Sequence, residues 1–283
     1  MGLKGMQRIK SRIIHLIRAL LRKVTGFGLP ELRLLSERCS SLEQRSSNLE
    51  HFRERFRTRV YMSSTQLLPN PALGKLSYGY EKSESGSSYR DFEDIFRGSE
   101  EFIKNRLRSY GGFFNAGDYV LEIGCGRGEF LELLAEWGVR YVGVDSDESM
   151  VERCREKGLS PVLHKDYESY FTESAPASFD AVFSAQFIEH IPSENITDFF
   201  RISHAALKPG GVLVAETVNP YSIEAFRTFH VDLTHQKILY PEVLIYACRV
   251  AGFQKAAIYY PNHNGYDETQ YDVAGEYAIV AYK

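Results

Sequence analysis

From residue 118 onward, short apolar runs alternate with segments whose apolar residues recur every three or four positions. The apolar runs predict strands, and the segments with wider spacing predict helices. The expected strands are 119–123, 141–144, 161–164, 181–184 and 212–216, and the expected helices are 129–137, 147–157 and 194–206. Two further strand-like runs, 255–260 and 276–282, follow each other without an expected helix between them. The pattern therefore predicts an α/β fold with a doubly wound, mostly parallel sheet and an antiparallel pair at its edge.

The first 30 residues have a different pattern, with no acidic side chain and seven basic ones between positions 4 and 23. Ile9, Ile13, Ile17, Leu20 and Val24 recur at helical spacing, which predicts a basic amphipathic helix over residues 4–24. Three roles remain open for this helix. It could lie on an anionic membrane surface, pack on this chain or a partner, or be a targeting segment that is removed.

The next segment, residues 31–58, carries an imperfect heptad pattern. Its apolar positions are Leu35, Cys39, Leu42, Leu49 and Phe56. Such a segment forms either a short coiled coil, which would make the protein a homo-oligomer, or a single helix lying on a domain. Residues 61–88 are rich in Ser, Gly and Pro and predict a linker, and a helix is expected at 89–109. We therefore expect a basic helical arm (1–60), a linker (61–88) and a folded α/β domain (89–283).

Charge and composition exclude several classes of protein. The net charge of −3 is the sum of +9 over residues 1–60 and −12 over residues 61–283. The acidic segment 61–283 is a poor candidate for binding nucleic acid, because it would repel the phosphates. The four cysteines form no C-x-x-C pair, which argues against a disulfide framework or structural zinc and favours the reducing cytoplasm. No apolar stretch is long enough to span a bilayer, so any membrane contact would be peripheral, on the inner face of the cytoplasmic membrane.

A glycine-rich turn follows the first predicted strand of the sheet. It contains Gly124, Gly126 and Gly128, and Asp145 ends the next strand 21 residues after Gly124. In a doubly wound sheet, ligands bind beyond the carboxyl ends of the strands, where a carboxylate can accept hydrogen bonds from ribose hydroxyls. The G-x-G-x-G spacing places Glu129 where a dinucleotide fingerprint has its third glycine, facing a pyrophosphate unfavourably. The pattern therefore favours an adenosine ligand without phosphates.

The run from Val120 to Gly128 resembles motif I of class I S-adenosylmethionine-dependent methyltransferases. Further matches follow in order: Asp145, Asp166, the strand 179–184 with Glu189-His190, and the Leu-Lys-Pro-Gly-Gly run at 207–211. The resemblance covers residues 118–283. It implies the Rossmann-like methyltransferase fold, with seven strands and an antiparallel last strand, and S-adenosylmethionine as cofactor.

A narrower resemblance concerns the segments 89–99 and 229–235. Both are similar to methyltransferases encoded with bacterial O-antigen and other surface-polysaccharide pathways. The Asp-Pro-Thr-His typical of those enzymes is Asp-Leu-Thr-His here, with Leu233 in place of the proline. This resemblance implies a glycan or glycolipid acceptor.

The resemblance to the class I enzymes also assigns a cofactor site. The residues expected there are Glu122, Gly124, Cys125, Gly126, Gly128, Asp145, Ser146, Asp166, Tyr167, Gln186 and Arg97. Asp145 would accept hydrogen bonds from the ribose hydroxyls, and Asp166 with Tyr167 would meet the adenine. Gln186 would lie beside the sulfonium. Arg97 could pair with the methionine carboxylate, or it could be a solvated arginine at a helix end.

An acceptor hydroxyl benefits from a general base. The candidates are His190, His230 and His235, with Glu189 and Asp232 as orienting groups or alternative bases. His190 ranks first because it follows the fourth strand, where the acceptor should lie. We assign no metal site, although His, Asp and Glu side chains together could also bind a divalent metal. A phosphate or carboxylate acceptor would need no base.

These observations predict an enzyme that transfers a methyl group from S-adenosylmethionine to a hydroxyl or phosphate of a glycan or glycolipid. The basic arm would bring it to lipid-linked substrate at the inner leaflet. Three alternatives remain. One is a methyltransferase for a small lipid-like or quinone acceptor, which an apolar acceptor pocket would favour. The others are a dinucleotide-dependent oxidoreductase and a non-catalytic interaction module that binds S-adenosylmethionine.

Overall fold

The structure is a computed structural model that describes residues 34, 38–40, 42–43, 67–70, 75–78, 97–222, 225–226, 229–261 and 275–283. The chain divides into two compact units, Met1–Val60 and Tyr61–Lys283. In the first unit the described residues are helical and exposed. The predicted basic helix at 4–24 and most of the heptad segment at 31–58 lie outside the described residues. Within the described part of the chain, no helix is both long and apolar enough to cross a membrane.

Two short strands lie in the segment expected to be a linker. β1 (Leu67–Asn70) and β2 (Lys75–Tyr78) pair antiparallel, with Leu67 opposite Tyr78. Proline and glycine in residues 71–74 mark the connection between them. Such turn residues occur in hairpins as well as in linkers, so the composition alone did not reveal the pair.

Seven strands form the main sheet of the second unit. They are β3 (Tyr119–Ile123), β4 (Arg140–Asp145), β5 (Val162–His164), β6 (Phe179–Ala185), β7 (Leu207–Val218), β8 (Lys255–Tyr259) and β9 (Glu276–Tyr282). Their order across the sheet is β5-β4-β3-β6-β7-β9-β8. All neighbouring pairs are parallel except those made by β9, which is antiparallel to β7 and β8. The predicted sheet and its antiparallel edge pair are confirmed.

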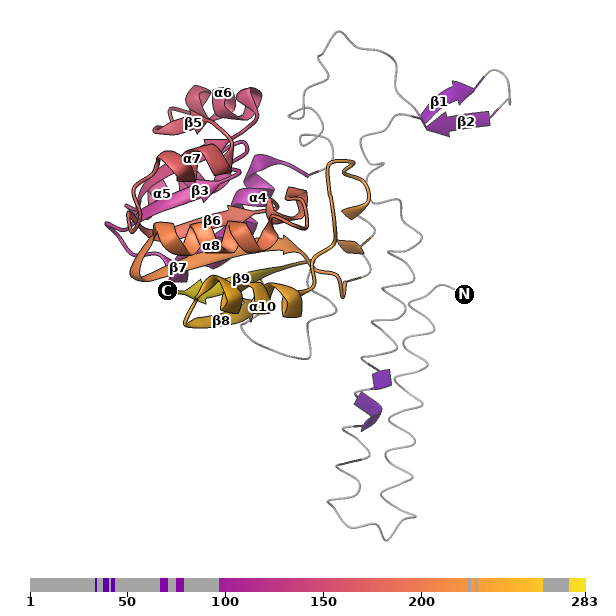
Figure 1. Ribbon diagram of the computed structural model, residues 1–283. Coiled ribbons are helices and arrows are strands. Elements are labelled where there is room, and N and C mark those ends of the chain that lie inside the picture. Colours follow the sequence, from indigo (N-terminus) through magenta and orange to yellow (C-terminus); the bar gives the residue numbers. More distant parts are fainter. Residues whose placement is uncertain are drawn as a thin grey trace. The chain divides into compact units, whose positions relative to one another are not determined.

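Helices cover both faces of this sheet (Figure 1). α4 (Glu100–Leu107), α5 (Glu129–Glu136) and α6 (Glu148–Glu156) contribute side chains to the apolar cluster on one face. α7 (Tyr167–Glu173), α8 (Ile196–Ala206) and α10 (Pro241–Ala251) contribute to the cluster on the other face. Two 3₁₀ helices, η1 (Arg108–Phe113) and η2 (Ile188–His190), follow α4 and β6.

Some elements differ from the expectation. The helix expected at 89–109 begins at Glu100, because the Ser99 hydroxyl caps it by accepting a hydrogen bond from the Phe102 backbone N–H at 3.3 Å. Residues 89–96 lie outside the described residues. β7 begins at Leu207, five residues before the expected start at 212, because Gly210 and Gly211 exchange backbone hydrogen bonds with Lys283.

The core on the α4–α6 face contains a group of stacked aromatic rings. The ring of Phe183, on β6, lies 3.6 Å from that of Phe130 and edge-on to those of Tyr110 and Phe114. Phe183 has no exposed surface, whereas Phe102 on α4 is 63% exposed. β6 is the middle strand of the sheet, so this group anchors the strand whose carboxyl end carries Gln186 and η2.

Replacing Phe183 by alanine should therefore destabilise the domain by about 3–5 kcal/mol, the usual cost of removing a buried phenylalanine. Phe102→Ala removes the same atoms at an exposed position and should change the free energy of unfolding by less than about 0.5 kcal/mol. Urea unfolding followed by circular dichroism measures both. Equal effects of the two substitutions would contradict the assigned core.

Candidate cofactor and acceptor site

The carboxyl ends of β3, β4, β5 and β6 surround a cavity of about 530 Å³. The strand order reverses between β3 and β6, and this switch point is where doubly wound sheets bind their ligands. The expected site residues that line it are Arg97, Gly124, Gly126, Asp145, Ser146, Asp166, Tyr167, Gln186 and His190. The structure thus brings together residues separated by up to 93 positions in the sequence.

The glycine loop after β3 has a backbone that only glycine adopts readily. Gly124, Gly126 and Gly128 all have positive φ, with +69° at Gly124. A Cβ atom on Gly124 would lie 2.7 Å from the Phe187 ring. On Gly128 it would lie 2.6 Å from a methyl group of Leu159. The lack of a side chain at Gly124 therefore leaves room for the Phe187 ring at the cavity wall. The lack of one at Gly128 allows α5 to pack against the segment after α6.

The carboxylate of Asp145 is held by the loops on either side of it. Its Oδ2 accepts a hydrogen bond from the Gly126 backbone N–H at 2.8 Å, and its Oδ1 accepts one from the Asp147 N–H at 2.9 Å. The arrangement fixes the direction of the carboxylate at the cavity wall.

Arg127, in the glycine loop, points into the protein rather than into the cavity. It is 1% exposed, pairs with the buried Glu129 at 2.8 Å and donates to the Gly98 carbonyl at 3.2 Å. This contact fixes the segment that precedes α4. Because Arg97 is the neighbour of Gly98, the same contact places Arg97 at the cavity wall.

Asp166 and Tyr167 begin α7 beside the cavity. Asp166 is the N-cap: its carboxylate accepts hydrogen bonds from the Ser169 backbone N–H and hydroxyl at 2.8 and 2.7 Å. These bonds to Ser169 lower the pKa of Asp166. The Asp166 carboxylate therefore has a structural role of its own, and the Tyr167 ring packs edge-on against Phe187.

Gln186 occupies a strained position at the end of β6. It has a φ of +55°, which is uncommon for a residue with a side chain. Its backbone N–H and its side-chain amide donate to the carbonyl and carboxylate of Glu216 at 3.1 Å each. Glu216 is fully buried and is also bound by Arg106 at 2.9 Å and by the Tyr110 hydroxyl at 2.7 Å. This network, which the sequence analysis missed, holds Gln186 at the cavity wall.

Four expected site residues are buried and are not among the residues that line the cavity. Glu122 and Cys125 are 4% and 3% exposed, and Gly128 packs against Leu159. One oxygen of Glu122, Oε2, is buried and has no hydrogen-bond partner among the described residues, and burial raises the pKa of this carboxyl well above its usual range. Glu189 is 1% exposed, and burial raises its pKa to about 8. Glu189 is thus a buried neutral carboxyl at pH 7, not an alternative base facing an acceptor.

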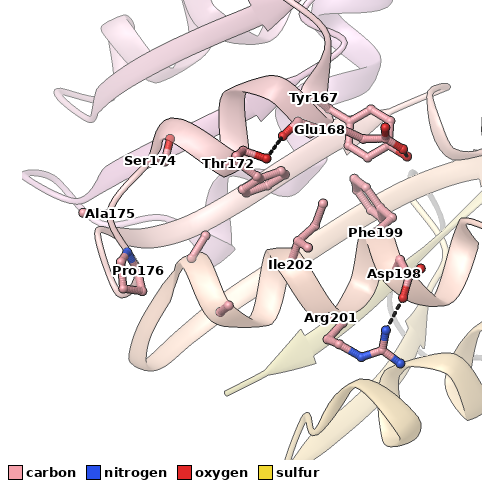
Figure 2. A pocket seen from close by; sticks show the side chains of 13 residues that line it. Tyr167, Glu168, Thr172, Ser174, Ala175, Pro176, Asp198, Phe199, Arg201 and Ile202 are labelled. Carbon is pink, nitrogen blue, oxygen red and sulfur yellow. Dashed lines mark hydrogen bonds and ion pairs between the residues drawn. The ribbon is translucent and has the colours of Figure 1, made fainter.

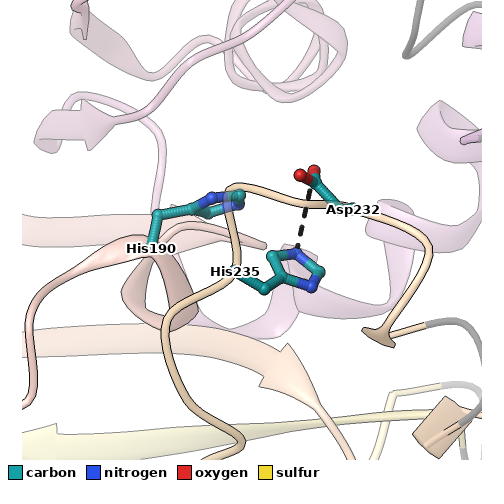
Figure 3. Close-up of side chains that lie close together, drawn as sticks. All are labelled: His190, Asp232 and His235. Atoms are coloured by element: carbon teal, nitrogen blue, oxygen red, sulfur yellow. Dashed lines mark ion pairs between the residues drawn. The ribbon is translucent and has the colours of Figure 1, made fainter.

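Three of the candidate catalytic residues form a cluster at the η2 end of the cavity (Figure 3). One nitrogen of His190, one nitrogen of His235 and one oxygen of Asp232 all lie within 4.8 Å of one another. His190 lines the cavity, and His235 and Asp232 lie behind it with side-chain exposures of 10% and 12%. His230 does not join the cluster, because its exposed ring packs between those of Phe226 and Phe229.

Hydrogen bonds hold this cluster in place. The Thr234 hydroxyl lies 2.6 Å from Asp232 Oδ1 and 2.9 Å from His190 Nδ1. His235 Nδ1 lies 2.7 Å from the Phe229 carbonyl oxygen. Burial, together with the neighbouring His235, lowers the pKa of His190 to about 4, and burial also lowers that of His235. Both imidazoles are therefore neutral at pH 7.

The sequence analysis did not name several apolar side chains that line the cavity. They are Ile123, Val144, Met150, Phe187, Ile191 and Pro192. Phe187, Ile191 and Pro192 flank His190 in sequence, and Thr234 joins them from the Asp-Leu-Thr-His loop. For Phe187, Ile191 and Pro192, the position shortly after the end of β6 is the signal that could have identified them.

A second hollow, of about 420 Å³, lies between α7 and α8 (Figure 2). Tyr167, Phe199 and Ile202 form its apolar side, and Arg201 pairs with Asp198 at its rim. Tyr167 is the one expected site residue among its lining. The cavity at the carboxyl ends of the strands is therefore the candidate functional site.

Comparisons with known proteins agree with this geometry. A family model described as a methyltransferase domain matches residues 95–257. Two curated relatives, both named ubiquinone biosynthesis O-methyltransferase, come from Pseudomonas aeruginosa and Xanthomonas oryzae pv. oryzae. They are 32% and 35% identical to this chain over 108 residues. That alignment covers 37% of this chain and 46% and 44% of the relatives, so the chain spans a little under half of their length.

A solved structure extends the comparison over a larger part of the chain. It is described as a SAM-dependent methyltransferase from Archaeoglobus fulgidus, is 31% identical and has a TM-score of 0.63. The match covers 70% of this chain and all of that protein. Together with the family model and the cavity at the strand ends, it shows that this chain belongs to the class I S-adenosylmethionine-dependent methyltransferases.

Proposed function

We propose that this enzyme transfers a methyl group to a hydroxyl of a small, largely apolar acceptor of the quinol type. The observation that carries this proposal is the apolar wall beside His190, formed by Phe187, Ile191 and Pro192. Apolar pockets with a few polar groups suit small hydrophobic ligands. A sugar, with hydroxyls around its ring, would leave many of its polar groups unpaired against such a wall.

The relatives support this acceptor over the glycan expected from the O-antigen resemblance. Both relatives described above are named for ubiquinone biosynthesis, and neither is named for a polysaccharide pathway. Because the aligned parts cover under half of each relative, the acceptor remains our proposal for this chain. The glycan acceptor becomes the competing outcome of the activity experiment below.

The residues at the cavity fit S-adenosylmethionine. The buried Glu122 Oε2, which has no hydrogen-bond partner among the described residues, can accept from the ammonium group of the methionine part. Asp145, fixed by two backbone amides, can accept from the ribose hydroxyls. Arg97, at the cavity wall, can bind the methionine carboxylate.

When bound, S-adenosylmethionine would supply an activated methyl group on its sulfonium. The chain's part is to align the acceptor with that methyl group and to exclude water. Gln186, held by Glu216, and the Phe187 ring, packed on Gly124, form the rigid wall for this alignment. The cluster of His190, Asp232 and His235 provides the polar groups that activate the acceptor hydroxyl.

The proposal also includes a role for the basic arm. A quinol-type acceptor with an apolar tail resides in a membrane, and the basic residues at 4–24 can hold the enzyme at an anionic surface. Homo-oligomer formation through residues 31–58 remains a prediction from the heptad pattern.

Methyl transfer from labelled S-adenosylmethionine tests the acceptor class. We expect label in a short-chain quinol bearing a hydroxyl group and none in lipid-linked glycan fractions from bacterial membranes. Label in the glycan fraction alone would contradict the proposed acceptor. Cofactor binding without transfer to any fraction would favour the non-catalytic module.

Asp145→Asn should weaken S-adenosylmethionine binding about 10- to 100-fold. The reason is that hydrogen bonds to charged groups contribute about 1.5–3 kcal/mol, and the new amide would also face the Gly126 N–H. The matched control is Asp118→Asn, which alters a carboxylate next to the first residue of β3, at the other end of the sheet. Isothermal titration calorimetry measures both. An unchanged Kd for S-adenosylmethionine in Asp145→Asn would show that the ribose does not bind to the Asp145 carboxylate.

Gly124→Ala should weaken cofactor binding more than tenfold, because its Cβ would push the Phe187 ring from the cavity wall. Gly138→Ala is the control: Gly138 has the same φ of +69°, but a Cβ there would have no atom within 4 Å. Both substitutions carry a backbone cost of about 1–2 kcal/mol, and Gly124→Ala should lower the thermal unfolding temperature further because its Cβ also displaces the ring. Equal losses of binding would show that backbone strain, not the Phe187 contact, is responsible.

Charge reversal in the arm tests membrane binding. The full chain should co-float with phosphatidylglycerol vesicles and not with phosphatidylcholine vesicles. Arg18→Glu combined with Arg22→Glu and Lys23→Glu should reduce this binding more than about 100-fold, at about 1 kcal/mol per basic residue. Unchanged flotation of the triple variant would argue for a different role of the arm.

A further inference from the structure

We propose that His190, Asp232 and His235 bind one divalent transition-metal ion at the acceptor end of the cavity. The three residues come from two segments that are 42 positions apart, η2 and the loop after β7. Two imidazoles and one carboxylate are ligands that zinc and iron(II) share in proteins. Binding of the ion stands on this geometry, whereas its role toward the acceptor rests on the proposed function.

The contact between His235 and Asp232 supports a cation between them (Figure 3). The Phe229 carbonyl can only accept, so His235 Nδ1 donates to it at 2.7 Å, and Nε2 is the ring nitrogen on the side of Asp232. That Nε2 faces Asp232 Oδ2 at 3.9 Å, which is too long for a hydrogen bond. A cation between these two atoms could be bound by both of them.

The separations are close to those of a metal site. Ligand atoms about 2.1 Å from a tetrahedral zinc ion lie about 3.4 Å from one another. The three ligand atoms here lie within 4.8 Å of one another. Closing the cluster on an ion therefore needs side-chain movements of about 1 Å, which rotamer adjustment at partly exposed residues can supply.

The groups around the cluster resemble the outer shell of metal sites. Metal-ligating histidines usually donate their other ring N–H to a carbonyl or similar acceptor, as His235 does to Phe229. The Thr234 hydroxyl orients both His190 and Asp232 through bonds of 2.9 and 2.6 Å. Thr234 and His190 also line the cavity, so the ion would face it.

Three protein ligands leave at least one position of the ion open. An acceptor hydroxyl bound there would lose its proton more readily, because a bound cation lowers the pKa of a coordinated oxygen. In this arrangement His190 is a ligand rather than a general base, and the hydroxyl proton leaves to solvent. The ion also fixes the oxygen at the cavity wall next to Gln186 and Phe187.

Metal titration of the tag-free, full chain tests the inference. After treatment with EDTA, we expect it to bind one Co²⁺ per chain with a visible absorption spectrum, and Zn²⁺ to displace the Co²⁺. Mg²⁺ should compete poorly, since it prefers oxygen ligands. His190→Gln, Asp232→Asn and His235→Gln should each weaken Co²⁺ binding at least 100-fold, and Thr234→Val about 10- to 100-fold.

The control is His204→Gln, which changes a histidine that packs against Phe253, outside the cluster, and should bind Co²⁺ normally. S-adenosylmethionine binding, measured on every variant, shows whether the domain is folded. Stoichiometric Co²⁺ binding that the cluster variants leave unchanged would overturn the site. Intact cofactor binding without Co²⁺ binding would overturn the cation while leaving the proposed function standing.

Methyl transfer links the ion to the reaction. We expect the EDTA-treated enzyme to lose about tenfold or more of its transfer to a quinol acceptor and to regain it with Zn²⁺ or Mn²⁺. An undiminished rate of methyl transfer by the metal-free enzyme would show that the ion has no role in the reaction. Failure of the metal-loaded wild-type chain to bind S-adenosylmethionine would instead overturn the proposed function, whatever the metal result.

Discussion

The packing of the Phe187 ring against the backbone of Gly124 determines the shape of the site. β3 and β6 are neighbours at the reversal of strand order, and the loops that follow them border the ligand cavity. Because a Cβ on Gly124 would lie 2.7 Å from the ring, the two loops approach as closely as a glycine allows. The remaining features of the site hold these two loops in position.

Two buried charged networks hold the loops. On the β3 side, Arg127 pairs with Glu129 and binds Gly98, which fixes the segment with Arg97. On the β6 side, Glu216 binds both amides of Gln186 and is itself bound by Arg106 and Tyr110. Removing one member of such a network leaves a buried charge without its partner, which is costly. Arg106 and Tyr110 come from α4 and η1, so the segment before the sheet helps to hold the part of the cavity wall that contains Gln186.

The sequence predicted the sheet and the cofactor loops because their signals are local. Apolar runs and glycine spacing lie within a few residues of one another, and strand ends meet at one edge by topology. α10 had a signal that was overlooked, since Leu244, Ala247, Cys248 and Ala251 are buried at helical spacing. Glu189 was expected beside the acceptor, but the tight turn of η2 points neighbouring residues in different directions, and only His190 of its three residues reaches the cavity. The Glu216 network and the cluster of His190 with Asp232 depend on contacts between distant segments, which no local pattern encodes.

The most direct measurement is a crystal structure of the full chain with S-adenosylhomocysteine, the product left after methyl transfer. Our account predicts the ribose hydroxyls at the Asp145 carboxylate and the amino-acid part beside Glu122 and Arg97. The thioether sulfur should face the end of the cavity that carries Gln186 and His190. S-adenosylhomocysteine bound anywhere other than the carboxyl ends of β3, β4 and β6, or with its sulfur turned away from His190, would contradict the account.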